Sequence, residues 1–211
     1  MRSLRWTPAY LKSKAGDELV EIMANRDADP HYEVHSERHR ELIRFADYVD
    51  MVYSGRVTND YYMVANNGFL RRPGTRALLA DFTVFPEYLD PVTASQQCFF
   101  WFGPAGTVTP LHHDGCNILA CQVAGRKNFR LVPASQWPLT YTDARFFSGI
   151  DAEKPDLSGR PGFDQATVLD VILEPGDVLF IPVGWSHQVR TLEPSMMISF
   201  TNFLFPNHYE W

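Results

Sequence analysis

The chain has 211 residues, of which 45% are hydrophobic and 21% are charged, and its formal net charge is −6 at pH 7. That length suffices for one domain with a buried core, and the composition excludes an intrinsically disordered chain. The negative balance argues against nucleic acid as the main partner, because a phosphate backbone requires a basic surface. No run of about 18 apolar residues is present, so we expect no membrane-spanning segment.

The cysteine content bears on the compartment. Cys98, Cys116 and Cys121 are an odd number of cysteines at irregular spacing. They predict small buried side chains in a reducing compartment rather than a disulfide framework. The first ten residues contain two arginines and no apolar segment, so no secretory signal is expected. These features favour a cytoplasmic location.

Two helices are predicted in the first part of the chain, residues 1–56, which we expect to form a helical support. Thr7 followed by Pro8 is the pattern of an N-cap and a proline at the first helical position. It predicts a helix over 8–15 that stops at Gly16. A second helix is predicted over 36–55 from apolar residues at helical spacing. These residues are Leu42, Phe45, Ala46, Val49, Val52 and Tyr53.

From residue 57 onwards, short segments rich in aromatic and β-branched side chains are separated by turns that contain glycine or proline. The predicted strands are 60–66, 97–103, 117–123, 127–132, 167–173, 177–182, 187–192 and 196–205. Many short strands of this kind predict an antiparallel sandwich or barrel behind a mixed α/β N-terminal part. Residues 134–166 are polar and predict a long insert. We therefore expect a single domain over 1–211 with its β core over 57–211.

The stretch TPLHHDGCN, residues 109–117, raises the first question of function, because two histidines precede an aspartate. In an extended segment, residues two apart point to the same face. His112 and Asp114 therefore project together, while His113 projects away. An imidazole and a carboxylate on one face are two of the three ligands in a facial metal site. Alone, such a pair is also common as a plain hydrogen-bonded pair.

A third ligand is found among the remaining histidines. Four of them lie in a charged stretch or in the C-terminal tail: His31, His35, His39 and His208. His187 instead follows directly after the apolar strand DVLFIP, in PVGWSHQV. The alternative is a core histidine satisfied by a backbone carbonyl. We predict that His112, Asp114 and His187 bind one metal ion.

Three protein ligands leave coordination positions open, as non-haem Fe(II) oxygenases require for a bidentate co-substrate and dioxygen. Such a co-substrate is 2-oxoglutarate, whose far carboxylate needs a cation in an apolar pocket. Lys127, at the start of a predicted strand, is the candidate. Because Arg126 and Lys127 are adjacent, one points inwards and the other outwards, and spacing alone leaves open which. A solvated surface lysine is the alternative.

Two longer stretches carry a family resemblance. WFGPAGTVTPLHHDGCNILACQVAGRKNFRLV and EPGDVLFIPVGWSHQV contain, in order, Trp-x-Gly, Thr-Pro-x-His-x-Asp, Gly-x-Lys, Gly-Asp-x-x-x-x-Pro and Trp-x-His. With these features the chain resembles the JmjC cupin-like Fe(II)/2-oxoglutarate oxygenases, and more narrowly their small branch of protein arginyl and asparaginyl hydroxylases. The resemblance implies a double-stranded β-helix (cupin, jelly-roll) core and iron held by His112, Asp114 and His187.

The resemblance also implies how 2-oxoglutarate is held. Lys127, fifteen residues after His112, pairs with the distal carboxylate of 2-oxoglutarate in this pattern. Thr109 hydrogen-bonds the same carboxylate. In this pattern a tyrosine joins Lys127 and Thr109 in binding this carboxylate, and Tyr62 fits that position better than Tyr61.

Two asparagines complete the implied site. Asn202, fifteen residues after His187, matches a polar position near the metal in the asparaginyl hydroxylases. Many relatives carry an asparagine six residues after the first iron histidine, where this chain has Ile118. Asn117, one position earlier, is the candidate for this asparagine's role in binding the co-substrate. Its shift by one residue is a departure from the family pattern.

The predicted function is an Fe(II)- and 2-oxoglutarate-dependent dioxygenase that hydroxylates a C–H bond of a protein side chain or a small molecule, with dioxygen as co-substrate. The alternative is a metal-binding cupin without oxygenase activity: a sensor, a scaffold, or a hydrolase or isomerase. Thr109 and Lys127 favour the oxygenase, because the other chemistries need no anchor for a dicarboxylate. We expect neither nucleic acid nor membrane as partner, and the sequence is compatible with a homodimer.

Overall fold

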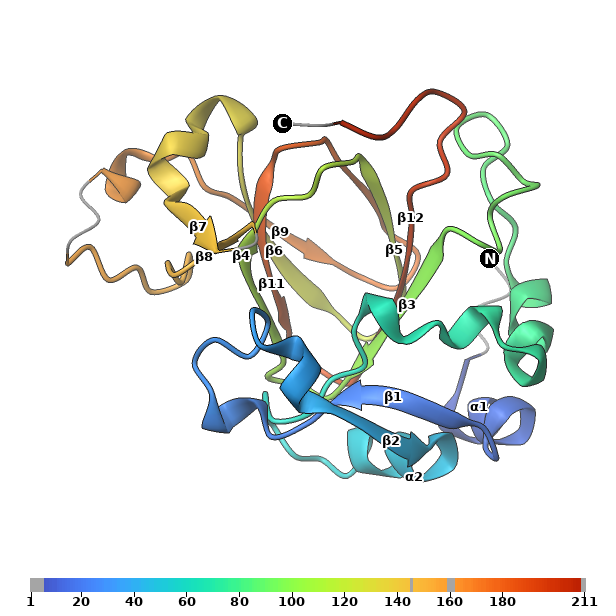
Figure 1. Ribbon diagram of the computed structural model, residues 1–211. Coiled ribbons are helices and arrows are strands. Elements are labelled where there is room, and N and C mark those ends of the chain that lie inside the picture. Colours follow the sequence, from blue (N-terminus) through green and yellow to red (C-terminus); the bar gives the residue numbers. More distant parts are fainter. Residues whose placement is uncertain (1–5, 145, 159–161, 210–211) are drawn as a thin grey trace.

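The protein is built around two antiparallel β-sheets that face each other, and the computed structural model describes residues 6–144, 146–158 and 162–209 (Figure 1). Within these ranges, one sheet has four strands in the order β10-β5-β12-β3, and the other has six in the order β7-β8-β4-β11-β6-β9. Strands β3 to β6 alternate between the two sheets, as do β9 to β12. That alternation is typical of a jelly-roll. The prediction of a mainly β, cupin-like fold is confirmed.

The strands of the two sheets are short, as their spacing in the sequence predicts. Their bounds are β3 (Cys98–Gly103), β4 (Val108–His112), β5 (Ile118–Ala124), β6 (Lys127–Val132), β7 (Thr142–Ala144), β8 (Phe147–Ser148), β9 (Leu169–Leu173), β10 (Val178–Ile181), β11 (Ser186–Thr191) and β12 (Ser195–Phe200).

Strands β3, β5 and β12 of the four-stranded sheet are covered on both faces, whereas the edge strand β10 exposes Val178 and Phe180. On β12, Met197 packs towards the other sheet with Ala120 and Phe129, whereas its neighbour Ile198 packs outwards with Phe100. Because both faces are buried, the strands read as continuous apolar runs instead of an alternating pattern.

The N-terminal part covers the outer face of that sheet and consists of α1 (Pro8–Ala15), β1 (Leu19–Met23), β2 (Arg40–Arg44) and α2 (Phe45–Val52). The side chain of Thr7 accepts a hydrogen bond from the backbone N–H of Tyr10, and Gly16 caps the other end of α1. This helix therefore begins and ends as its N-cap and glycine signals predict.

The predicted helix over 36–55 is only partly correct. Ser36–His39 is a short 3-10 helix, Arg40–Arg44 is strand β2, and the α-helix begins at Phe45. Pairing with β1 satisfies the backbone of β2, and it leaves Leu42 66% exposed. The helical spacing from Leu42 to Phe45 is thus accidental, because tertiary pairing overrides a local pattern.

Two predicted strands also differ from the structure. Residues 60–66 make only the isolated bridges Met23↔Tyr62 and Met63↔Phe102, and β12 ends at Phe200. The sequence did not predict β1, β2, β7 or β8, and it indicated β4 only as an extended segment around His112 and Asp114. The remaining short helices of the described ranges are 3-10 turns: η2 (Arg26–Ala28), η3 (Ser36–His39), η4 (Ala65–Asn67), η5 (Phe69–Arg71), η6 (Pro73–Asp81), η7 (Ala134–Thr140) and η8 (Phe163–Gln165). No helix in the described ranges has the length and apolar character needed to cross a bilayer.

The insert over 134–166 packs on the outer face of the six-stranded sheet in its described part. Ile150 and Phe163 form an apolar cluster there with Leu111 of β4. Gln188 of β11 accepts a hydrogen bond from the backbone N–H of Ala152 and donates one to the Asp151 carboxylate. The insert is therefore attached to the same strands that carry the candidate metal ligands.

Candidate metal centre

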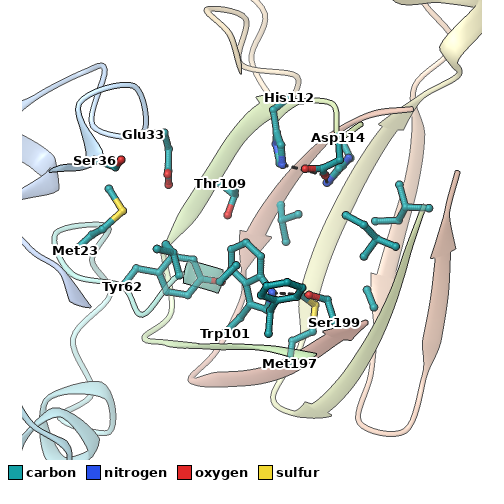
Figure 2. A pocket seen from close by; sticks show the side chains of 18 of the residues that line it. Met23, Glu33, Ser36, Tyr62, Trp101, Thr109, His112, Asp114, Met197 and Ser199 are labelled. Atoms are coloured by element: carbon teal, nitrogen blue, oxygen red, sulfur yellow. Dashed lines mark hydrogen bonds and ion pairs between the residues drawn. The ribbon is translucent and has the colours of Figure 1, made fainter. Parts of the chain in front are cut away.

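The three predicted metal ligands meet at the ends of two adjacent strands. His112 ends β4, and His187 lies opposite it on β11 in antiparallel register. A register shift follows on β4, where Pro110 lies, and a β-bulge is one of the few places at which a sheet tolerates proline. The turn after β4 brings Asp114 to both rings, as Figure 2 shows for His112.

The distances fit one ion. Asp114 Oδ2 is 3.7 Å from His112 Nε2 and 3.6 Å from His187 Nε2. One ligand atom from each residue lies within 4.8 Å of the other two. Two imidazole nitrogens and a carboxylate oxygen are the donor set of a facial non-haem iron site.

Backbone carbonyls orient both imidazoles. His112 Nδ1 is 2.8 Å from the carbonyl oxygen of Pro110, and His187 Nδ1 is 3.1 Å from that of Trp185. The proton on each Nδ1 leaves the Nε2 lone pair free for a metal. Burial, and next the neighbouring His112, lower the pKa of His187 to about 4, so this ligand is neutral near pH 7. A carbonyl contact was the alternative explanation for His187, and here it holds the ring in the ligating orientation.

His113 points away from this cluster, as strand parity predicts. Its ring packs edge-on against Phe146 and Trp137, with centroids 5.3 Å and 5.8 Å away. Burial lowers the pKa of His113.

The ligands open into a cavity of about 460 Å³ between the two sheets (Figure 2). Its walls are mainly apolar and include Phe129, Ile181, Val189 and Met197. Such a volume accommodates a small co-substrate together with a substrate side chain.

Lys127 lies behind one wall of this cavity. Its side chain is fully buried and donates hydrogen bonds to the Tyr62 hydroxyl at 2.7 Å and the Thr191 hydroxyl at 3.0 Å. Tyr62 and Thr109 both line the cavity. We call Tyr62, Thr109, Lys127 and Thr191 the polar seat. Arg126 points outwards and pairs with Glu193 at 2.9 Å, so the structure decides which of the two neighbouring cations faces inwards.

Gly103 explains how the Tyr62 ring reaches this position. A Cβ atom on Gly103 would lie 2.5 Å from Cδ2 of Tyr62, which is far inside van der Waals contact. The glycine of the Trp-x-Gly feature therefore makes room for the phenol of the polar seat.

Comparison with known proteins agrees with this geometry. The family model of the cupin-like domain matches residues 3–209. The chain belongs to the cupin-like domain family. It is 30% identical over 204 residues to Lysine-specific demethylase 8 of Xenopus tropicalis, covering 93% of this chain and 44% of the relative. It is 30% identical over 205 residues to Lysine-specific demethylase JMJ30 of Arabidopsis thaliana, covering 90% of this chain and 44% of the relative.

A third relative matches a shorter part of this chain. Over 119 residues the chain is 38% identical to HSPB1-associated protein 1 of Mus musculus, which covers 53% of this chain and 24% of the relative. The chain thus spans less than half the length of these curated relatives. The resemblance to JmjC and cupin-like proteins is confirmed by the family match and by these relatives.

Two asparagines of this cupin-like chain lie outside the cavity wall, and the structure corrects the expectation that they contact a co-substrate. Asn117 Oδ1 accepts a hydrogen bond from the backbone N–H of Val183, and its Nδ2 donates to Asn207 Oδ1. Asn202 Nδ2 donates to the carbonyl oxygen of Asp90. Their neighbours Ile118 and Thr201 line the cavity instead. The alternation of side chains in an extended chain places the two asparagines on the opposite side, where they tie loops together.

Arg26 and Glu33 are site residues that sequence reasoning missed. Arg26 has no exposed surface and pairs with Glu33 at 3.1 Å. Glu33 lines the metal cavity, and burial raises the pKa of its carboxyl group, while Arg26 opposes that rise. In the sequence both belong to a charged stretch that resembles a solvated loop, and no local pattern indicates their burial.

Proposed function

We propose that this cupin-like protein is an Fe(II)- and 2-oxoglutarate-dependent dioxygenase that hydroxylates a C–H bond, with a protein side chain as its substrate. The observation that carries the proposal is the position of a fully buried lysine, hydrogen-bonded through Tyr62 to the wall of a cavity that also holds the His-Asp-His cluster. A buried cation next to an open metal site suits a ligand that chelates metal at one end and carries a carboxylate at the other.

Each part of the site has a separate task. His112, Asp114 and His187 hold Fe(II) through one ligand atom each. Iron, 2-oxoglutarate and dioxygen supply the oxidation when bound, so that one oxygen atom enters the product and the other enters succinate as carbon dioxide leaves. The polar seat orients the distal carboxylate of 2-oxoglutarate, and apolar walls such as Phe129 and Val189 exclude water from the reacting C–H bond.

The names of the relatives indicate which substrate side chains to test. Relatives are named lysine-specific demethylases, and oxidation of an N-methyl carbon is the same C–H step. Hydroxylation and demethylation are therefore two outcomes that one such site supports.

The test separates binding from turnover. Anaerobic addition of Fe(II) and then 2-oxoglutarate should produce a weak visible charge-transfer band, and air should then yield succinate even without substrate. Incubation with lysine- and arginine-containing peptide pools should add about 16 Da, one oxygen atom, to a product, or remove a methyl group from a methylated peptide. Iron loading without the band would contradict the proposal.

A metal-binding cupin without oxygenase activity remains the second candidate, because a three-ligand site with open positions also suits a zinc hydrolase. Such an enzyme has no use for the polar seat. Metal-dependent hydrolysis of a model ester, with no 2-oxoglutarate binding, would favour this candidate.

A further inference from the structure

Arg26 is a buried cation that the packing of the fold leaves incompletely satisfied. Its Nη2 donates hydrogen bonds to Glu33 Oε1 at 3.1 Å and to the carbonyl oxygen of Val108 at 2.7 Å. Its Nε and Nη1 have no hydrogen-bond partner in the part of the chain that the structure describes. Buried donors without partners are costly for stability, so the position of Arg26 calls for a reason beyond packing.

The guanidinium group lies beside the polar seat. Its central carbon is 4.2 Å from the centroid of the Tyr32 ring and 5.3 Å from that of the Tyr62 ring. Lys127 Nζ is 5.0 Å from the same Tyr62 centroid. Two fully buried cations, Arg26 and Lys127, therefore lie against the same Tyr62 ring. The ring attracts each of them, but the two positive charges repel each other at low dielectric.

The charges around the seat do not balance. Glu33 is the carboxylate that pairs with Arg26, and Lys127 has hydroxyl partners, with no carboxylate within ion-pair distance in the described residues. With both cations protonated, two buried positive charges face one negative charge. An anion bound at the seat would restore the balance.

We propose that Arg26 is a positioning residue of the polar seat: it packs on Tyr62 and supplies a second buried positive charge, which a bound dicarboxylate neutralises together with that of Lys127. This inference rests on the proposed function. It assigns to Arg26 a part in the affinity for 2-oxoglutarate and in the dependence of that affinity on pH.

The affinity for 2-oxoglutarate depends on pH because Lys127 can lose its proton while the polar seat is empty. Burial, and next the charge of Arg26, lower the pKa of Lys127 to about 7. Above that pH the empty seat holds a neutral amine, whereas a bound carboxylate requires the ammonium form. Binding of 2-oxoglutarate must then take up a proton, and the affinity falls as the pH rises.

The other groups that face the seat do not reproduce this behaviour. Burial raises the pKa of Tyr62, of Tyr48 on α2 and of Tyr32, so the three phenols stay protonated. Thr109, Thr191 and the backbone of β9 carry no titrating proton. Glu33 faces Arg26 and His112, and burial raises the pKa of its carboxyl group; it pairs with Arg26 and not with Lys127. Arg126 and Glu193 pair on the outer surface.

The experiment is calorimetric titration of the metal-loaded protein with 2-oxoglutarate under anaerobic conditions, from about pH 6 to about pH 8.5, in buffers of different ionisation enthalpy. For the wild type we expect a constant Kd below about pH 7 and a rise of roughly tenfold per pH unit above it, with about one proton taken up. Arg26→Met should weaken binding at low pH and move the onset of the rise to higher pH. Arg26→Lys keeps the charge and should keep the onset.

Two controls isolate the effect. Arg126→Met makes the same chemical change next to Lys127 on the outer surface and should leave both Kd and its onset unchanged. The 2-keto acid 2-oxobutyrate, which lacks the distal carboxylate, should show no onset near pH 7.

The outcomes are separable. The role of Arg26 would be overturned if the wild-type Kd did not vary with pH and no proton were taken up. It would also be overturned if Arg26→Met weakened binding equally at every pH and Arg26→Lys did not restore it. If Arg26→Met does not fold, the wild-type profile and Arg26→Lys decide. Absence of 2-oxoglutarate binding at any pH would instead overturn the proposed function itself, and this inference with it.

Discussion

His187 on β11 lies directly opposite His112 on β4, and the centroids of their imidazole rings are 4.2 Å apart. The two residues are far apart in the sequence, and the antiparallel register of two strands makes them neighbours. Because each ring is held by a backbone carbonyl through Nδ1, the strands themselves determine where the two Nε2 atoms point. Metal binding at this position thus depends on the pairing of β4 with β11.

The first prediction concerns the tandem histidines. His112→Ala should abolish iron binding and 2-oxoglutarate turnover, a loss larger than the roughly 10–100-fold that removal of a supporting residue costs. His113→Ala removes an adjacent imidazole that packs against Phe146 and Trp137, and it should retain most of both. Bound iron per chain and succinate formation are the measurements. An equal loss in the two variants would contradict the assignment of His112.

The second prediction separates metal binding from co-substrate binding. Lys127→Met removes the buried ammonium group and keeps much of its volume. The loss of a charge-assisted hydrogen bond, about 1.5–3 kcal/mol, corresponds to roughly a 10–150-fold rise in Kd for 2-oxoglutarate. Iron stoichiometry should not change. Loss of iron in this variant would show that Lys127 acts on the metal ligands and not on the dicarboxylate.

The third prediction uses the close approach of β3 to Tyr62. In Gly103→Ala the new methyl group would lie 2.5 Å from the ring, so the phenol must move, at a cost of about 1–3 kcal/mol in the free energy of unfolding. Affinity for 2-oxoglutarate should fall while iron binding persists.

A double-mutant cycle provides the control for Gly103→Ala. Once Tyr62→Ala has removed the ring, Gly103→Ala should cause little further loss of 2-oxoglutarate affinity. Additive losses would mean that Gly103 acts through some other contact.

The fourth prediction is a dependence of stability on pH that needs neither metal nor substrate. Lys127 has a pKa of about 7 in the folded protein, where burial is the main cause, and an ordinary lysine pKa near 10.4 in the unfolded chain. Between these values the unfolded chain binds a proton that the folded protein does not, so the free energy of unfolding rises with pH. The total rise is on the order of a few kcal/mol.

Denaturant titrations of the metal-free protein at several pH values between about 7 and about 10 give the measurement. The stability of the wild type relative to Lys127→Met should increase across this range, because the variant has no such proton. Arg126→Met should show the same slope as the wild type. Parallel curves for wild type and Lys127→Met would refute the lowered pKa.

Some features of this protein follow from the sequence by itself. Strand periodicity separates His112 and Asp114 from His113, because successive side chains of an extended backbone point to opposite faces. The helix over Pro8–Ala15 follows from local capping chemistry. The mainly β fold follows from short apolar strands with regular turns, which need only local patterns to be recognised.

Other features were decided by tertiary structure. Whether Arg126 or Lys127 faces inwards depends on which face of β6 meets the opposite sheet. The Asn117 and Asn202 side chains form hydrogen bonds with loop residues that are distant in the sequence. Strand β2 forms because β1 is available to pair with it. Arg26 is buried against partners from distant parts of the chain, among them a carbonyl group 82 residues away that accepts its hydrogen bond. Local patterns reflect the geometry of the backbone, whereas burial and charge pairing arise from contacts between distant residues, and those contacts exist only in the folded chain.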